Sequence, residues 1–158
     1  MRPLYDAVIA LGRDPHWYRD GKVPDTIDGR FDMIAALFAI LLLRFEQEGH
    51  AADQDSVLLT ELFIDDMDGS LRQIGIGDLV VGKHVGNMMG ALGGRLSAFR
   101  EGFAPGGDLH RAVVRNIFRE APPSDESVRY IAERLSDFRD RLAITALERL
   151  IEGELPGA

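Results

Sequence analysis

The sequence predicts an all-α protein: a single-domain bundle of about six to seven helices around one buried central helix. Three observations support this prediction. Apolar residues recur at three- and four-residue spacing through most of the chain, and no stretch alternates in the manner of a strand. Residues 27–48 are apolar nearly all round, which is typical of a helix at the centre of a bundle. A chain of 158 residues suits one domain, residues 1–158.

The first half of the chain predicts four helices. They cover about residues 3–12, 14–18, 27–48 and 53–74, and Trp17 in the second is expected to anchor the core. Proline and short polar residues mark their starts, because these residues fit the first turn or satisfy its free N–H groups. The start signals are Pro3, Asp14, Asp25 or Thr26, and Asp53 or Asp55.

The second half predicts three more helices, over about residues 78–103, 109–119 and 124–153. Pro-Gly-Gly and Pro-Pro-Ser sequences separate them. The last is a long C-terminal helix with apolar residues at the 3-4 spacing of a two-helix seam. The middle one carries arginines four apart, which would form one basic stripe on its surface: Arg111, Arg115 and Arg119.

Residues 61–94 contain two unusual features: a predicted sharp break between two helices, and a row of regularly spaced glycines. Gly75 and Gly77 followed by Asp78 predict a tight break between two helices, with Asp78 capping the second. In that second helix a glycine stands at every fourth position from 82 to 94, beside Met88 and Met89. Such a row lets another helix approach the backbone closely. It would pack either against the chain's own helix around Phe38 or against a helix of another protein.

Composition restricts the classes of function. Cysteine is absent and the net charge is −8, which excludes disulfides and thiolate metal sites and argues against direct nucleic-acid binding. Residues 71–120 differ, with 7 Lys or Arg against 4 Asp or Glu, and so suit an acidic partner or a membrane surface. The longest apolar run has eleven residues, residues 33–43, whereas a membrane span needs about twenty.

The signals for catalysis are poor. Asp65, Asp66 and Asp68 resemble the aspartate-rich Mg²⁺ motif of all-α prenyl-transferring enzymes, but the spacing is DDxD, and no second such helix follows. The four histidines form no pair of zinc type. We therefore expect no cofactor, no bound metal and no enzyme. A small metal-dependent all-α enzyme using the aspartates stays as an alternative, as does a homodimeric structural module.

Two long blocks resemble the ubiquinol–cytochrome c chaperone family. The first contains VPDTIDGRF at residues 23–31, and the second contains DMDGSLRQIGIGDL at residues 66–79. They lie in the family's order, and the resemblance covers about residues 1–120. It implies an assembly factor for the cytochrome bc1 complex, respiratory complex III. Its client would be newly made cytochrome b or another bc1 subunit, with a small partner subunit or a second copy beside it.

The resemblance also implies a place of action and a set of contact residues. The chain starts at the family's first helix, so we expect a bacterial, cytoplasmic member with peripheral association at the inner membrane. Three acids close together repel one another, which favours a contact role for the aspartate cluster. The expected contact residues, drawn from the two blocks and the glycine row, are Asp25, Gly29, Arg30, Asp65, Asp66, Asp68, Arg72, Lys83, Gly86, Met89 and Gly90.

Overall fold

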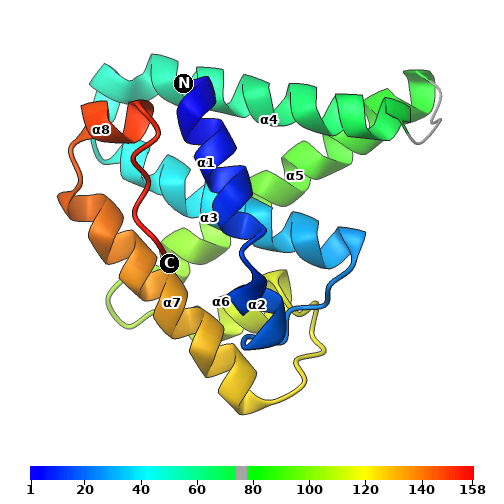
Figure 1. Ribbon diagram of the computed structural model, residues 1–158, viewed down its shortest axis with the longest axis vertical. Helices are drawn as coiled ribbons and strands as arrows, with labels where there is room; N and C mark the ends of the chain where they lie inside the picture. Colours follow the sequence, from blue (N-terminus) through cyan, green and yellow to red (C-terminus); the bar gives the residue numbers. More distant parts are fainter. Residues whose placement is uncertain (74–77) are drawn as a thin grey trace.

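Helix α3 (Ile27–Glu46) is the centre of the fold, as its composition predicts. Thirteen of its residues are buried, and they lie on every side of the helix. Helices α1, α4, α5 and α7 all pack against it, and Figure 1 shows it passing behind α1 through the middle of the molecule. This computed structural model describes residues 1–73 and 78–158, and it describes no side chains for residues 68, 70–73, 78–82, 84 and 85.

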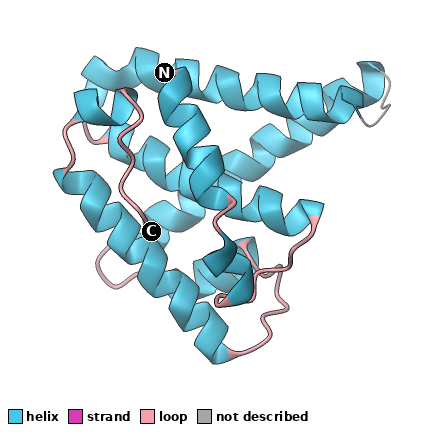
Figure 2. Ribbon diagram, in the orientation of Figure 1, coloured by secondary structure: helices cyan, strands magenta, loops and turns pink. Residues whose placement is uncertain are grey.

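The surrounding elements are helices joined by loops, and the described part of the chain contains no strand (Figure 2). The all-α prediction is therefore confirmed. None of the helices, as far as the described residues go, is long and apolar enough to cross a membrane. The elements around α3 are α1 (Arg2–Gly12), α2 (Pro15–Arg19), the 3-10 turn η1 (Gly49–Ala52), α4 (Asp53–Gln73), α5 (Asp78–Phe103), α6 (Leu109–Asn116), α7 (Asp125–Ile144) and α8 (Leu147–Ile151).

The predicted helix starts are confirmed where the structure describes their side chains. Asp14 accepts a hydrogen bond from the backbone N–H of His16, and Thr26 accepts one from Gly29. Ser124 and Asp108 cap α7 and α6 in the same way. Trp17 is fully buried, and its indole N–H donates to the carbonyl oxygen of Leu11 at 2.8 Å, so it anchors the core as expected.

The long C-terminal helix is two helices. Helix α7 ends at Ile144, and α8 begins at Leu147 after a residue with extended backbone, Thr145. The guanidinium of Arg44 lies against this end and donates to the carbonyl oxygens of Leu142 (3.0 Å) and Thr145 (3.3 Å). Carbonyl groups at a helix end have no partner within the helix, so a buried arginine stabilises the break. The break lets α8 turn back toward α1.

An ion cluster inside the bundle joins α3, α5 and the segment after α6. Asp32 is 1% exposed, and its carboxylate accepts from Arg95 at 2.6 Å and from Arg119 at 2.7 and 3.1 Å. Burial lowers the pKa of Arg95, whereas the hydrogen bond to Asp32 raises the pKa of Arg119. Arg119 and Glu120 both have positive φ, a conformation that costs free energy in residues other than glycine. Arg119 pairs with Asp32 and Glu120 pairs with Arg111, and these ion pairs hold the two residues in this backbone conformation.

The basic stripe predicted for the helix over residues 109–119 is therefore wrong. The helix ends at Asn116, so Arg119 leaves its face and turns inward to Asp32. Arg111 forms a two-bond ion pair with Glu120, at 2.6 and 2.7 Å. The sequence spacing assumed a helix three residues too long, and the acids that neutralise the two arginines stand outside it.

Replacing Asp32 by Asn should destabilise the fold strongly, because two arginines would lose their buried carboxylate. We expect the free energy of unfolding in urea to fall by about 3 kcal/mol. Asp28→Asn is the matched control: Asp28 also pairs with Arg119 (3.3 Å) but is largely exposed, so the loss should stay within about 0.5 kcal/mol. Equal losses for the two variants would contradict a central role for Asp32.

The fold should also lose stability in mild acid because of His16. Burial beside Trp17 and Tyr130 lowers the pKa of His16 below its ordinary value. Above about pH 6.5 the histidine is neutral in both the folded and the unfolded chain. Below that pH the unfolded chain takes up the proton first, so the free energy of unfolding decreases as the pH falls. His16→Gln should weaken this decrease between pH 7 and pH 5 in urea titrations, and a decrease as steep as that of the parent would contradict the role of His16.

Candidate functional site

The glycine row on α5 faces solvent. Gly86, Gly90, Gly93 and Gly94 are all exposed, and a Cβ atom added to any of them would meet nothing within 4 Å outside its own stretch of helix. The opposite side of α5 carries the buried residues Leu92, Arg95 and Phe99. The interpretation that the row packs against the chain's own Phe38 helix is therefore wrong for these four glycines.

An exposed glycine row is costly for a helix. Each glycine inside a helix costs about 1 kcal/mol relative to alanine, and four cost about 4 kcal/mol. Packing by the described residues does not offset this cost, because no side chain among them reaches over these four glycines. The row leaves a smooth strip of bare backbone, with Lys83 exposed at one end and Met89 half-buried on its flank.

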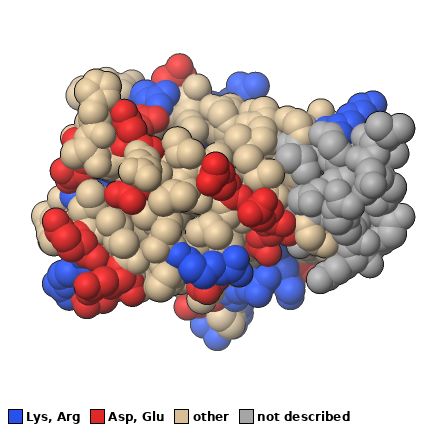
Figure 3. Space-filling view, turned by 90° about the horizontal axis from the view of Figure 1, so that it is seen from above, with Lys and Arg blue, Asp and Glu red and all other residues tan. Residues whose placement is uncertain are grey.

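Helix α4 packs against α5 near the segment that joins them, and it has an exposed side of its own (Figure 1). Its outward side carries exposed Val57 (55%), Leu58 (41%), Glu61 and Asp65. Large apolar side chains in solvent beside acids are typical of a surface that meets another protein. Figure 3 shows acidic and basic groups interspersed over the described part of one face, without a single dominant sign of charge.

Asp66 has a partner within the chain. The hydroxyl of Tyr5 donates to its carboxylate at 2.8 Å, which joins α1 to α4. Burial first, and then this bond, raise the pKa of Tyr5, so the phenol keeps its proton and remains a donor. The repulsion among the three acids favours a contact role, but Asp66 has a structural role within the chain. Asp65 is exposed, and the side chains of Asp68 and Arg72 lie outside the described set.

The residues carried over from the first block have structural tasks. Arg30 donates to Asp25 at 2.7 Å, and both side chains are more than half exposed. A Cβ at Gly29 would collide with the carbonyl oxygen of Pro24, so only glycine fits there. Arg30 and Asp25 line a hollow with Arg13 and residues of α2, and no bond links them to Asp65 or Asp66 among the described side chains.

Aromatic rings join α3 to α4. Phe63 of α4 stacks on Phe38 of α3, with ring centroids 5.1 Å apart, and lies 6.1 Å from Phe31. The corner residues Gly75 and Gly77 lie outside the described residues, and so does the side chain of Asp78.

The described side chains gather no group of three or more His, Asp or Glu residues able to hold a metal ion. Because Asp68 is outside this set, the metal-dependent alternative is tested only for Asp65 and Asp66. Sequence reasoning missed Asp32, Arg95 and Tyr5, which carry the polar contacts inside the bundle. A signal was available for Asp32, because it directly precedes the long apolar run of residues 33–43 on a helix expected to be buried, and a buried acid needs a cation.

Comparisons with known proteins agree with the geometry. The model of the family described as ubiquinol-cytochrome C chaperone matches residues 19–155, which extends the resemblance through the last helices, beyond the limit near residue 120 expected from the two blocks. A crystal structure of the Cbp3 homolog from Brucella abortus superimposes with a TM-score of 0.84 at 27% identity. The match covers 99% of this chain and 87% of that one.

No curated protein sequence gives a significant match. The family model spans well over half of the chain, and the Brucella abortus structure reproduces the all-α arrangement from end to end. The chain therefore belongs to the ubiquinol–cytochrome c chaperone family.

Proposed function

We propose that the protein holds newly made cytochrome b, or another membrane subunit of the cytochrome bc1 complex, during assembly of the complex. The observation that carries the proposal is the exposed glycine row on α5. The row costs the isolated chain stability, and no contact from the described residues offsets this cost. A client helix lying along it would restore close packing, as in contacts between small residues of membrane helices.

The methionines beside the row and the exposed residues of α4 support a reversible contact. Met88 and Met89 are half-buried on the flanks of α5, and methionine side chains adapt to irregular apolar partners. Val57 and Leu58 add apolar area on α4, while Lys83 and Asp65 supply charges of both signs. An adaptable apolar strip beside charges suits a client that must later leave. Because the client is a membrane protein, we expect the contact to form at the cytoplasmic face of the inner membrane.

Deleting the gene should lower the amount of assembled bc1 complex and leave other respiratory enzymes intact, because the client subunit would lose its protection. Haem spectra and native gels of membranes measure this. A plasmid copy of the gene should restore the complex. Normal bc1 levels in the deletion strain would reject the assembly role.

The glycine row can be tested separately from folding. In Gly86→Leu/Gly90→Leu, the new side chains would stand in open space, and leucine favours a helix over glycine by close to 1 kcal/mol per site. We therefore expect a higher melting temperature together with less bc1 complex in the complemented deletion strain. Glu133→Leu, which adds an exposed leucine to α7, should leave assembly unchanged. Normal assembly with the double variant would remove the row from the client surface.

A photo-crosslinking residue identifies the client directly. Placed at position 86 on α5 or at exposed position 65 on α4, it should link to cytochrome b in cells that make the bc1 complex, because both positions lie on the proposed surface. At position 133 on α7 it should give no such product. A link to a different bc1 subunit would show that the client is that subunit, and the proposed surface on α5 would stand. Links to cytochrome b from position 133 alone would move the client site away from α5.

A further inference from the structure

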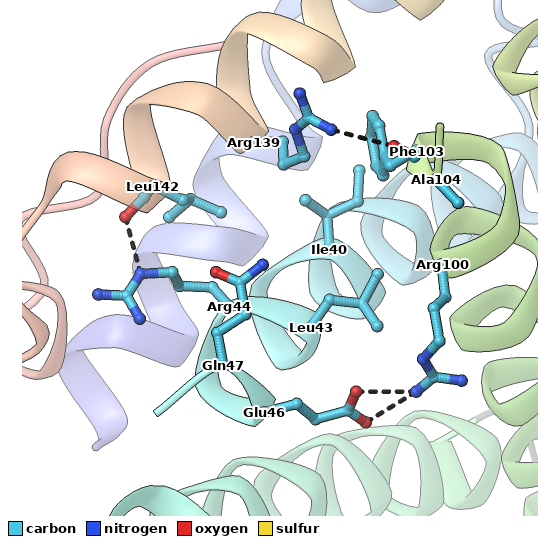
Figure 4. Close-up of a pocket in the computed structure, with 10 residues that line it drawn as sticks. All are labelled: Ile40, Leu43, Arg44, Glu46, Gln47, Arg100, Phe103, Ala104, Arg139 and Leu142. Atoms are coloured by element: carbon cyan, nitrogen blue, oxygen red, sulfur yellow. Dashed lines mark hydrogen bonds and ion pairs between the residues drawn. The ribbon is translucent and has the colours of Figure 1, made fainter. Parts of the chain in front are cut away.

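A hollow between α3, α5 and α7 has an apolar floor and a basic rim. Its volume is about 400 Å³, within the range of small-molecule sites. Figure 4 shows Ile40 and Leu43 of α3 at its centre, with Phe103 and Leu142 on the neighbouring helices. The hollow lies among α3, the end of α5 and α7, and shares no lining residue with the glycine row.

Three arginines surround this floor, from α3, α5 and α7 (Figure 4). Arg44 is fixed, because its side chain is 10% exposed and caps the end of α7. Arg100 and Arg139 are 52% and 40% exposed, and each forms an ion pair at the surface, with Glu46 and Asp140. Such pairs contribute at most about 1 kcal/mol, so the two guanidinium groups can exchange partners.

Arg139 in particular is weakly held on the side of the hollow. Its guanidinium lies 4.7 Å from the centre of the Phe103 ring, and it reaches the carbonyl oxygen of Phe103 only at 3.5 Å. Arg100 offers one amino nitrogen to both oxygens of Glu46, at 2.9 and 2.8 Å. A guanidinium group has five N–H donors, so both arginines can bind a further anion.

We propose that this hollow binds a small organic anion with a short hydrocarbon chain, such as a medium-chain carboxylate. The head group would take hydrogen bonds from Arg100 and Arg139, and the chain would lie on Ile40, Leu43 and Phe103. The lining includes three arginines and Glu46, and the acids Glu48 and Asp140 at the edge of the hollow complete three ion pairs with these arginines. The unused N–H donors of these guanidinium groups beside an apolar floor suit a ligand with an anionic head group and a hydrocarbon chain.

The surroundings favour a single free molecule over the surface of an anionic membrane. Glu46, Glu48 and Asp140 stand at the edge of the hollow with side chains 50%, 39% and 63% exposed. A flat anionic bilayer would have to approach these carboxylates, which repel it. A single chain entering between the arginines would avoid them.

Sodium octanoate, titrated into the full chain and followed by amide NMR shifts and calorimetry, tests the proposal. We expect shifts at residues 40–47 and 100–104, and binding about ten-fold weaker in Arg100→Gln and in Arg139→Gln, because each loses a charge-assisted hydrogen bond. Arg129→Gln, an exposed position on α7 away from the hollow, is the control and should bind as the parent does. Amide spectra of each variant establish that it is folded.

Three further probes separate the anionic head group from the hydrocarbon chain, and a free molecule from a membrane surface. Neutral n-octanol and inorganic phosphate should each bind at least ten-fold more weakly than octanoate, since each lacks one feature. Phosphatidylglycerol vesicles should give no binding that depends on Arg100 or Arg139. Octanoate binding that is absent, that is unchanged in both arginine variants, or that phosphate equals would overturn the proposal. Vesicle binding lost in the arginine variants would overturn it in favour of a membrane contact.

Discussion

The need to cover α3 on all sides determines the rest of the structure. A helix with buried residues all round its axis cannot lie at a surface, so the other helices have to surround it. Most of the fully buried large side chains belong to α3 or touch it, among them Phe38 and Phe63, whose rings stack. The single acid within this apolar surface, Asp32, then requires the buried Arg95 and the half-exposed Arg119, which tie α5 and the segment after α6 to the centre.

Covering α3 uses one side of each outer helix and leaves the other sides for other tasks. On α5 the inner side supplies Leu92, Arg95 and Phe99, while the outer side carries the glycines. The division explains how the same helix can hold the core together and still present bare backbone to a partner. The same argument applies to α7, whose seam of Val128, Ile131, Leu135, Phe138 and Leu142 is buried within its own bundle. That seam is therefore not open to a second chain.

Much of the fold could be predicted from the sequence because its signals are local. Caps such as Thr26 and Ser124 act on the next few residues, and the apolar run of α3 by itself predicts that this helix is buried. The contacts that could not be predicted join distant residues: Tyr5 with Asp66 is 61 positions apart, and Asp32 with Arg119 is 87. The break after Ile144 depends on Arg44, about a hundred residues earlier. For the glycine row, Leu92, Leu96 and Phe99 on the opposite side of the helix already indicated which side turns inward.

The bare backbone of α5 has a consequence for the range of helices that it could accept. A surface made of side chains favours one complementary pattern of side chains, whereas exposed glycines offer mainly peptide groups and Cα hydrogens. Weak contacts from Cα–H groups to carbonyl oxygens are available to almost any helix that comes close enough. Recognition along this strip would therefore depend on the shape of the incoming helix and on small residues along it. It would tolerate variation in the sequence of the incoming helix, so one strip could accept helices with quite different side chains.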